Sequence, residues 1–138
     1  MLKLFLFAWL LTNAGLNQSK LNLPLQNGTI VAYKNDSGMG VEILPTDNFE
    51  VKSCSDATIH FAALMDFNKR TLVIARKDSI DFIYVLDSSF VVKGQKISKG
   101  MVIGKLSDIN KEQEPLIFYV KVEGKDVNPR HYMTYVNE

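Results

Sequence analysis

The sequence predicts an all-β fold, a small sandwich or barrel-sandwich of antiparallel strands preceded by an N-terminal signal segment. Short runs rich in β-branched and aromatic residues recur between Gly-, Asn- and Asp-containing turns. After residue 14, no stretch repeats apolar residues at the three- and four-residue spacing of a helix. Gly94 and Gly100 stand in tight turns on either side of a short strand, and glycine adopts the positive φ of such turns without a Cβ penalty.

The expected strands follow one another in about nine short runs. Residues 28–33 are rich in β-branched and aromatic side chains, and the polar cluster 34–40 forms a turn after them. Pro45 ends the second run, and residues 76–80 are mostly polar and of hairpin length. Residues 108–114 lack an apolar face, which indicates an exposed loop. The main strands are expected over residues 28–33, 41–44, 49–53, 57–64, 71–75, 81–86, 96–98 and 116–122.

The N-terminus has the layout of a secretory signal peptide. Lys3 precedes an uncharged apolar run over residues 4–11, and small and polar residues follow it up to Gly15. The run is too short for a stable transmembrane span, which takes roughly 20 residues. A helix packed on the domain is the alternative. We therefore expect a signal peptide over 1–14, a linker over 15–24, one β domain over 25–134 and a tail over 135–138.

The overall composition is that of an ordinary globular domain of 138 residues, with 46% apolar and 22% charged residues. The net charge of +1 gives no broad positive field and argues against a nucleic-acid partner. The single cysteine, Cys54, excludes an intramolecular disulfide and a zinc site built from cysteines. We interpret Cys54 as a buried small apolar residue rather than a reactive thiol.

Several segments, in order, resemble one known domain. Gly40-Val-Glu-Ile43 matches a Gly-Ile-Asp-Ile strand, and Phe82-Ile-Tyr-Val-Leu86 matches a strand ending in Y-x-H-L. Residues 91–104 match V-x-x-G-x-x-V-x-x-G-x-x-I-G, 116–118 match part of H-L-H-F-E, and 124–129 match G-x-x-V-x-P. From about residue 23 to residue 132, the chain thus resembles the lysostaphin-type (LytM) metallopeptidase domain of bacterial cell-wall hydrolases, a duplicated-hybrid-motif fold.

The resemblance implies a zinc site that this chain lacks the residues to build. The family binds one Zn²⁺ through two imidazoles and one carboxylate, with a fourth position open for water. The positions of the family's zinc ligands and assisting histidines match Gly38, Glu42, Leu86, Pro115 and Ile117. Of these, only Glu42 keeps a ligand group, so the resemblance implies a degenerate, non-catalytic domain without a cofactor. The two histidines, His60 and His131, share no ligand spacing and are interpreted as strand and surface residues.

The same resemblance predicts where a partner would bind. With the metal ligands replaced, the former active-site face becomes an apolar cleft that could hold a peptide or a helix. The residues expected to line this groove are Met39, Glu42, Tyr84, Leu86, Pro115 and Ile117. Most other aromatic residues are expected in the core. The lysines at 93, 96, 99 and 105 are interpreted as an exposed edge that discourages strand pairing, with contact to an anionic surface as the alternative.

These observations favour an exported, non-catalytic LytM-like interaction domain of the periplasm or cell envelope. Its expected role is to regulate or scaffold peptidoglycan hydrolysis through an envelope protein partner, a cell-wall hydrolase or its regulator, with peptidoglycan as a further contact. One alternative is a divergent zinc endopeptidase acting on peptidoglycan. Another is an assembly module of the biotinyl/lipoyl barrel-sandwich type, which shares the paired Gly turns, although no Met-Lys-Met or Asp-Lys tip is present for modification.

Overall fold

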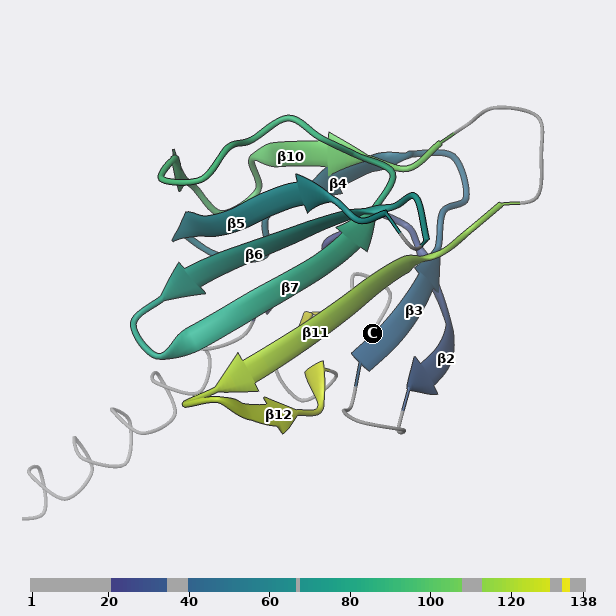
Figure 1. Ribbon diagram of the computed structural model, residues 1–138. Coiled ribbons are helices and arrows are strands. Elements are labelled where there is room, and N and C mark those ends of the chain that lie inside the picture. The colour runs from purple at the N-terminus through teal and green to yellow at the C-terminus, as the bar shows by residue number, and fades with distance from the viewer. Residues whose placement is uncertain (1–20, 35–39, 67, 108–112, 130–132, 135–138) are drawn as a thin grey trace, which may run out of the picture.

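The computed structural model describes residues 21–34, 40–66, 68–107, 113–129 and 133–134. Within these ranges the secondary structure is almost entirely β (Figure 1). The strands are β1 (Leu21–Asn22), β2 (Thr29–Lys34), β3 (Gly40–Leu44), β4 (Glu50–Lys52), β5 (Ala57–Leu64), β6 (Thr71–Lys77), β7 (Ile80–Leu86), β8 (Ser88–Ser89), β9 (Lys96–Ile97), β10 (Val102–Lys105), β11 (Leu116–Val122), β12 (Lys125–Val127) and β13 (Met133–Thr134).

One large antiparallel sheet dominates the fold. Its strands are ordered β2-β3-β11-β7-β6-β5-β9, with β12 pairing with β11. A smaller sheet has the order β4-β10-β8, and Figure 1 shows β4 and β10 next to β5 at one end of the large sheet. The predicted all-β fold of antiparallel sheets is therefore confirmed, although β1 and β13 pair in parallel.

The core lies between the large sheet and the smaller one. Alternate residues along most of β11 and β7 are buried, among them Phe118 and Tyr84, whose ring centroids are 5.1 Å apart. Ile103 of β10 and Val51 of β4 complete the core from the other side. Alternation of buried and half-exposed residues follows from the two-residue period of a strand, so the opposite face of the large sheet carries the other half of the side chains.

Cys54 lies in this core, as predicted. Its side chain is fully buried, its backbone N–H donates to the Tyr84 hydroxyl at 3.1 Å, and its Sγ lies 3.0 Å from the same oxygen. Burial raises the pKa of the Cys54 thiol to about 12, so the thiol stays protonated and unreactive. The phenol of Tyr84 thus has hydrogen-bond partners inside an otherwise apolar interior.

The paired turns also form as predicted. Gly94 and Gly100 have φ values of 92° and 87°, which other residues rarely adopt. Only the end of the expected linker over 15–24 lies within the described residues: Leu21–Asn22 is a strand, and Pro24 is buried, its carbonyl accepting a hydrogen bond from Lys52 N–H. The rest of that segment lies outside the described residues, as do the expected signal peptide and tail. Among the described residues, no helix is long and apolar enough to cross a membrane.

Candidate functional site

The open face of the large sheet holds two of the positions that the sequence resemblance matched to zinc ligands, Glu42 and Ile117. Ile117 of β11 is the direct register partner of Glu42 on β3 and of Val85 on β7. Val85 in turn lies opposite Leu72 of β6. All these side chains are half-exposed and point away from the core. The row therefore begins with the carboxylate of Glu42 and continues with aliphatic side chains on β11, β7 and β6.

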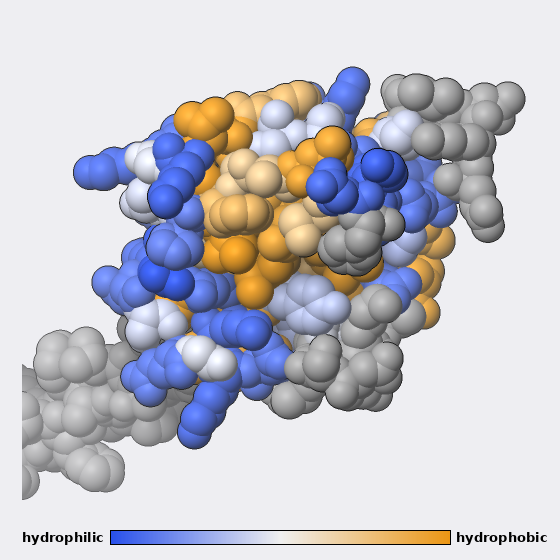
Figure 2. Space-filling view, in the orientation of Figure 1, coloured by the Kyte–Doolittle hydropathy of each residue, from blue (hydrophilic) through white to orange (hydrophobic). Residues whose placement is uncertain are grey.

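A second row runs parallel to the first on the same face. Tyr119 of β11 lies opposite Ile83 of β7, Ile83 lies opposite Ile74 of β6, and Ile74 lies opposite Phe61 of β5. Phe61 is 38% exposed and the isoleucines are half-exposed. In Figure 2 hydrophobic side chains gather over the middle of this face, above the strands that Figure 1 labels β6 and β7. We call the two rows together the open apolar face.

Two of the residues predicted to line a groove do not reach this face. Tyr84 and Leu86 are fully buried, and Leu86 packs against Gly104, where an added Cβ would overlap it. Successive residues of a strand point to opposite faces, so aligning the sequence motif one residue too far along β7 assigns a buried side chain to the exposed face. Val85, not Leu86, occupies the exposed position next to Ile117.

The remaining predicted site residues are only partly brought together. Pro115 is half-exposed two residues before Ile117, so these two and Glu42 lie at the same end of the face. Gly38 and Met39 lie outside the described residues, and so does His131. His60 is exposed at a β-bulge of β5, between Ile59 and Phe61.

Tyr119 fills space beside Glu42 in a way that the sequence did not reveal. A methyl group at Gly40 would overlap the Tyr119 ring, so this ring lies directly against the backbone of Gly40. Gly40 is two residues before Glu42 on β3, and the glycine is what allows the ring to approach so closely. An aromatic side chain thus covers β3 at Gly40, two residues before Glu42.

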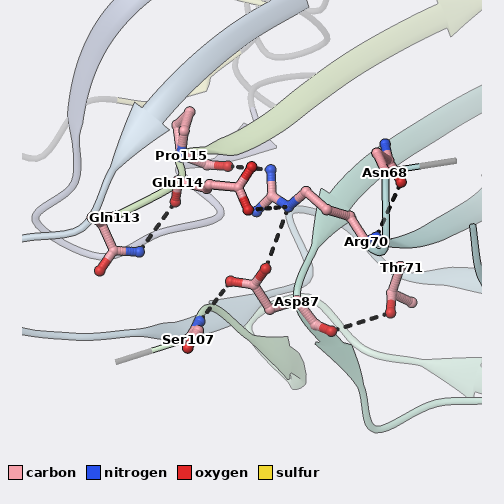
Figure 3. Close-up of polar contacts among 8 residues, drawn as sticks. All are labelled: Asn68, Arg70, Thr71, Asp87, Ser107, Gln113, Glu114 and Pro115. Carbon is pink, nitrogen blue, oxygen red and sulfur yellow. Dashed lines mark hydrogen bonds and ion pairs between the residues drawn. The ribbon is translucent and has the colours of Figure 1, made fainter. Parts of the chain in front are cut away.

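A buried arginine fixes the end of the face at which Pro115 lies (Figure 3). The Arg70 side chain is only 5% exposed. Its Nη1 donates to the Pro115 carbonyl at 2.7 Å and its Nε donates to Asp87 Oδ1 at 3.3 Å. The other oxygen of Asp87 accepts the Ser107 N–H at 2.6 Å, and Glu114 Oε1 lies 3.8 Å from Arg70 Nε. One guanidinium therefore ties the ends of β6, β7 and β11 together.

Sequence reasoning missed Arg70, because a lone arginine before an apolar strand has no motif around it. Its backbone N–H is held by Asn68 Oδ1 at 3.0 Å, which places the side chain at the end of the sheet. Among the described residues, its Nη2 has no hydrogen-bond partner although it is buried. A buried charge of this kind needs partners, and Asp87 and the Pro115 carbonyl supply them.

The donor set at this end of the face does not fit a zinc ion. Three nitrogen or oxygen ligands must converge at about 2.0–2.2 Å for a site of the family's type. Glu42 supplies a carboxylate, whereas its neighbour Ile117 and the next residue in the row, Val85, supply only hydrocarbon. In the part of the chain that the structure describes, no group of three His, Cys, Asp or Glu residues could hold a metal ion.

Comparison with known proteins gives one family and one fold. The model for peptidase family M23 matches residues 36–129. A sequence search of curated proteins found no significant match.

Three solved structures illustrate the structural similarity. Csd3 of Helicobacter pylori superposes with a TM-score of 0.68 at 19% identity, over 85% of this chain and 34% of that one. An M23 peptidase structure from Pseudomonas aeruginosa gives 0.67 at 17% identity, over 81% and 49%. A complex of SpoIIIAH and SpoIIQ gives 0.66 at 18% identity, over 83% and 100%. The chain thus spans about a third of the Csd3 chain, and at these identities the likeness concerns the fold.

Proposed function

The chain belongs to peptidase family M23, and from this premise we propose that it is an exported, non-catalytic member that binds a protein partner and regulates or scaffolds cell-wall peptidoglycan hydrolysis. The observation that carries the proposal is the row Glu42–Ile117–Val85. Where the family places imidazoles around a zinc ion, this row presents one carboxylate followed by aliphatic side chains. Such a row cannot activate water, but it can bind apolar surface.

The endopeptidase alternative has little chemistry available to it. A single carboxylate holds zinc poorly against water, and hydroxide forms at neutral pH only on a firmly bound metal. The Tyr119 ring against Gly40 further fills the strand beside Glu42. Neither His60, exposed on β5, nor any second carboxylate joins Glu42 in the described part of the chain to rebuild a ligand set.

The open apolar face is suited to a partner protein. Most of it consists of half-exposed aliphatic side chains from β6, β7 and β11, with Tyr119 and Phe61 in one row and Glu42 at the end of the other. A contiguous exposed apolar patch of this kind is typical of an interaction site. Binding would bury hydrocarbon that water now touches, at about 25 cal/mol per Å² of apolar surface. The solved complex of SpoIIIAH and SpoIIQ, with the same fold, is compatible with this role.

The proposed location is the periplasm or cell envelope, and it rests on the signal-peptide layout of residues 1–14. The proposed partner is an envelope protein, a cell-wall hydrolase or its regulator, with peptidoglycan as a further contact.

Affinity capture of the chain from cell envelopes, followed by a wall-cleavage assay with and without it, tests the proposal. We expect a wall-remodelling enzyme in the captured set and a changed cleavage rate when the chain is added. The double variant Ile74→Thr/Ile83→Thr keeps β-branched side chains on register partners while removing apolar surface, so it should lose both effects. Val31→Thr is the matched control, because Val31 is exposed on edge strand β2. Unaltered cleavage and a captured set without such an enzyme would refute the proposal.

A further inference from the structure

A second surface, formed by residues 90–105, combines exposed apolar side chains with concentrated positive charge. Phe90, Val92 and Met101 are 55%, 67% and 37% exposed. The exposed lysines of the same segment are Lys93, Lys96, Lys99 and Lys105. The segment contains no Asp or Glu, whereas the whole chain carries a net charge of only +1. The remaining residues are therefore net negative, and the positive charge is gathered here. We call residues 90–105 the basic segment.

The backbone holds the basic segment in a fixed shape. The beginning and the end of the segment lie side by side, because the Phe90 N–H donates to the Ile103 carbonyl at 2.8 Å. The first turn is tied to β5, because Gly94 N–H donates to the Ile59 carbonyl at 2.7 Å, and the second is tied to the Ser53 carbonyl by Gly100 N–H at 2.8 Å. Val91 is buried between Phe90 and Val92, so these two side chains are directed outward. The apolar groups are thus presented to solvent by an ordered scaffold.

The nearby carboxylates compensate this charge only in part. Glu50 is the register partner of Lys105, and Asp56 Oδ1 accepts the backbone N–H of Lys99 at 2.8 Å. Within the described ranges, none of the segment's lysine side chains forms a salt bridge. An open pocket beside β9 is lined by the cations Lys96, Arg76 and Lys77 and by the carboxylates Asp56 and Asp78.

We propose that the basic segment binds the surface of a bilayer rich in anionic phospholipid. Lysines near such a surface are attracted by its negative potential, and exposed aromatic and aliphatic side chains enter the boundary between headgroups and acyl chains. A soluble polyanion would use the lysines but would leave Phe90 and Val92 in water. The presence of both kinds of side chain on one segment is therefore what favours a lipid surface.

The basic segment shares no residue with the open apolar face, although β9 pairs with β5, the strand that carries Phe61. β9 is one edge strand of the large sheet, and β2, next to β3 and Glu42, is the other. The inference is independent of the proposed function, since it concerns a different surface and a different ligand.

Cosedimentation of the full chain with vesicles tests the inference. We compare vesicles of phosphatidylcholine containing phosphatidylglycerol with vesicles of phosphatidylcholine alone. Lys93→Gln/Lys99→Gln should weaken partitioning to the anionic vesicles about 25-fold, at about fivefold per lysine. Lys69→Gln/Lys125→Gln removes the same charge from exposed positions elsewhere and should leave partitioning within about twofold of the unmodified chain.

Phe90→Ser/Val92→Ser separates a bilayer from a soluble polyanion, because it keeps every charge. It should also weaken binding to the anionic vesicles, and its unfolding midpoint should stay near that of the unmodified chain because both side chains are exposed. Equal losses for the two lysine pairs, or undiminished binding of the Phe90/Val92 variant, would overturn the inference. Undiminished binding of all variants would also overturn it, since residues 4–11 would then account for any lipid contact.

Discussion

Ile117 lies directly opposite Glu42 across the β3–β11 ladder, with both side chains on the open face of the sheet. Directly opposed residues on one face have Cβ atoms about 4.5–5.5 Å apart, so these side chains are neighbours. In the family, the position of Ile117 matches the second histidine of H-L-H-F-E. On this alignment the carboxylate faces hydrocarbon where the family has an imidazole, and our proposal that the domain is non-catalytic rests on this pair.

The placement of Val85 and Leu86 predicts that the same substitution has a small effect on stability at one position and a large one at the next. Val85→His places an imidazole on the half-exposed face and should change the free energy of unfolding by less than about 1 kcal/mol. Leu86→His places it in the core and should cost about 3 kcal/mol or more, because a buried polar group without partners is added where apolar packing is lost. Urea unfolding of the two variants measures both values. Similar costs would contradict the placement of Val85 on the exposed face and Leu86 in the core.

The contact between Tyr119 and Gly40 predicts that the loss of stability caused by a substitution at Gly40 depends on the Tyr119 ring. Gly40→Ala should destabilise the fold by about 1–3 kcal/mol, because the added methyl group overlaps the Tyr119 ring. In the background of Tyr119→Ala, the same change should cost much less, since the overlapping ring is absent. A double-mutant cycle by chemical denaturation measures this coupling. Additive effects would show that the ring does not lie against Gly40.

The Arg70 contacts predict that a buried ion pair matters far more than an exposed one. Arg70→Met should lower the free energy of unfolding by about 2–3 kcal/mol, because Asp87 and the Pro115 carbonyl lose their donor. Arg76→Met is the matched control, because Arg76 pairs with Asp81 at 2.6 Å but is 45% exposed. That variant should lose much less stability than Arg70→Met, because water screens an exposed ion pair. Equal losses at the two positions would contradict a structural role for Arg70.

Cys54 and Tyr84 predict that the fold weakens at alkaline pH. Burial raises the pKa of the Cys54 thiol to about 12 and that of the Tyr84 hydroxyl well above its usual range. The folded state therefore keeps protons that the unfolded chain releases. The free energy of unfolding should be steady below about pH 8.5 and then fall as pH rises, by up to about 1.4 kcal/mol per pH unit for each group.

Cys54→Ala is the control for this pH dependence. Between about pH 9 and about pH 10 the thiol of the unfolded chain ionises more than the phenol, because its unperturbed pKa is lower. The slope of unfolding free energy against pH in that interval should therefore be smaller in the variant. An unchanged slope would assign the effect to groups other than Cys54.

The alternation of apolar residues and the glycine turns predicted the fold well, because both depend on local rules. The positions of Gly94 and Gly100 follow from the need for positive φ. The site was harder to predict, since a motif aligned one residue out of place assigned Leu86 to the wrong face. Neither Arg70 nor the Tyr119 ring has a local signal, because their partners Pro115 and Gly40 are distant in sequence and meet them only in the folded sheet.

The zinc content of the purified chain tests the central claim most directly. After addition of Zn²⁺ and dialysis, we expect far less than one bound zinc per chain, because Glu42 alone holds the metal poorly. The variant Gly38→His/Ile117→His restores two imidazoles at the positions that match the family and is the positive control. It should retain more zinc than the unmodified chain. One tightly bound zinc in the unmodified chain would contradict the claim that this M23 domain has lost its metal site.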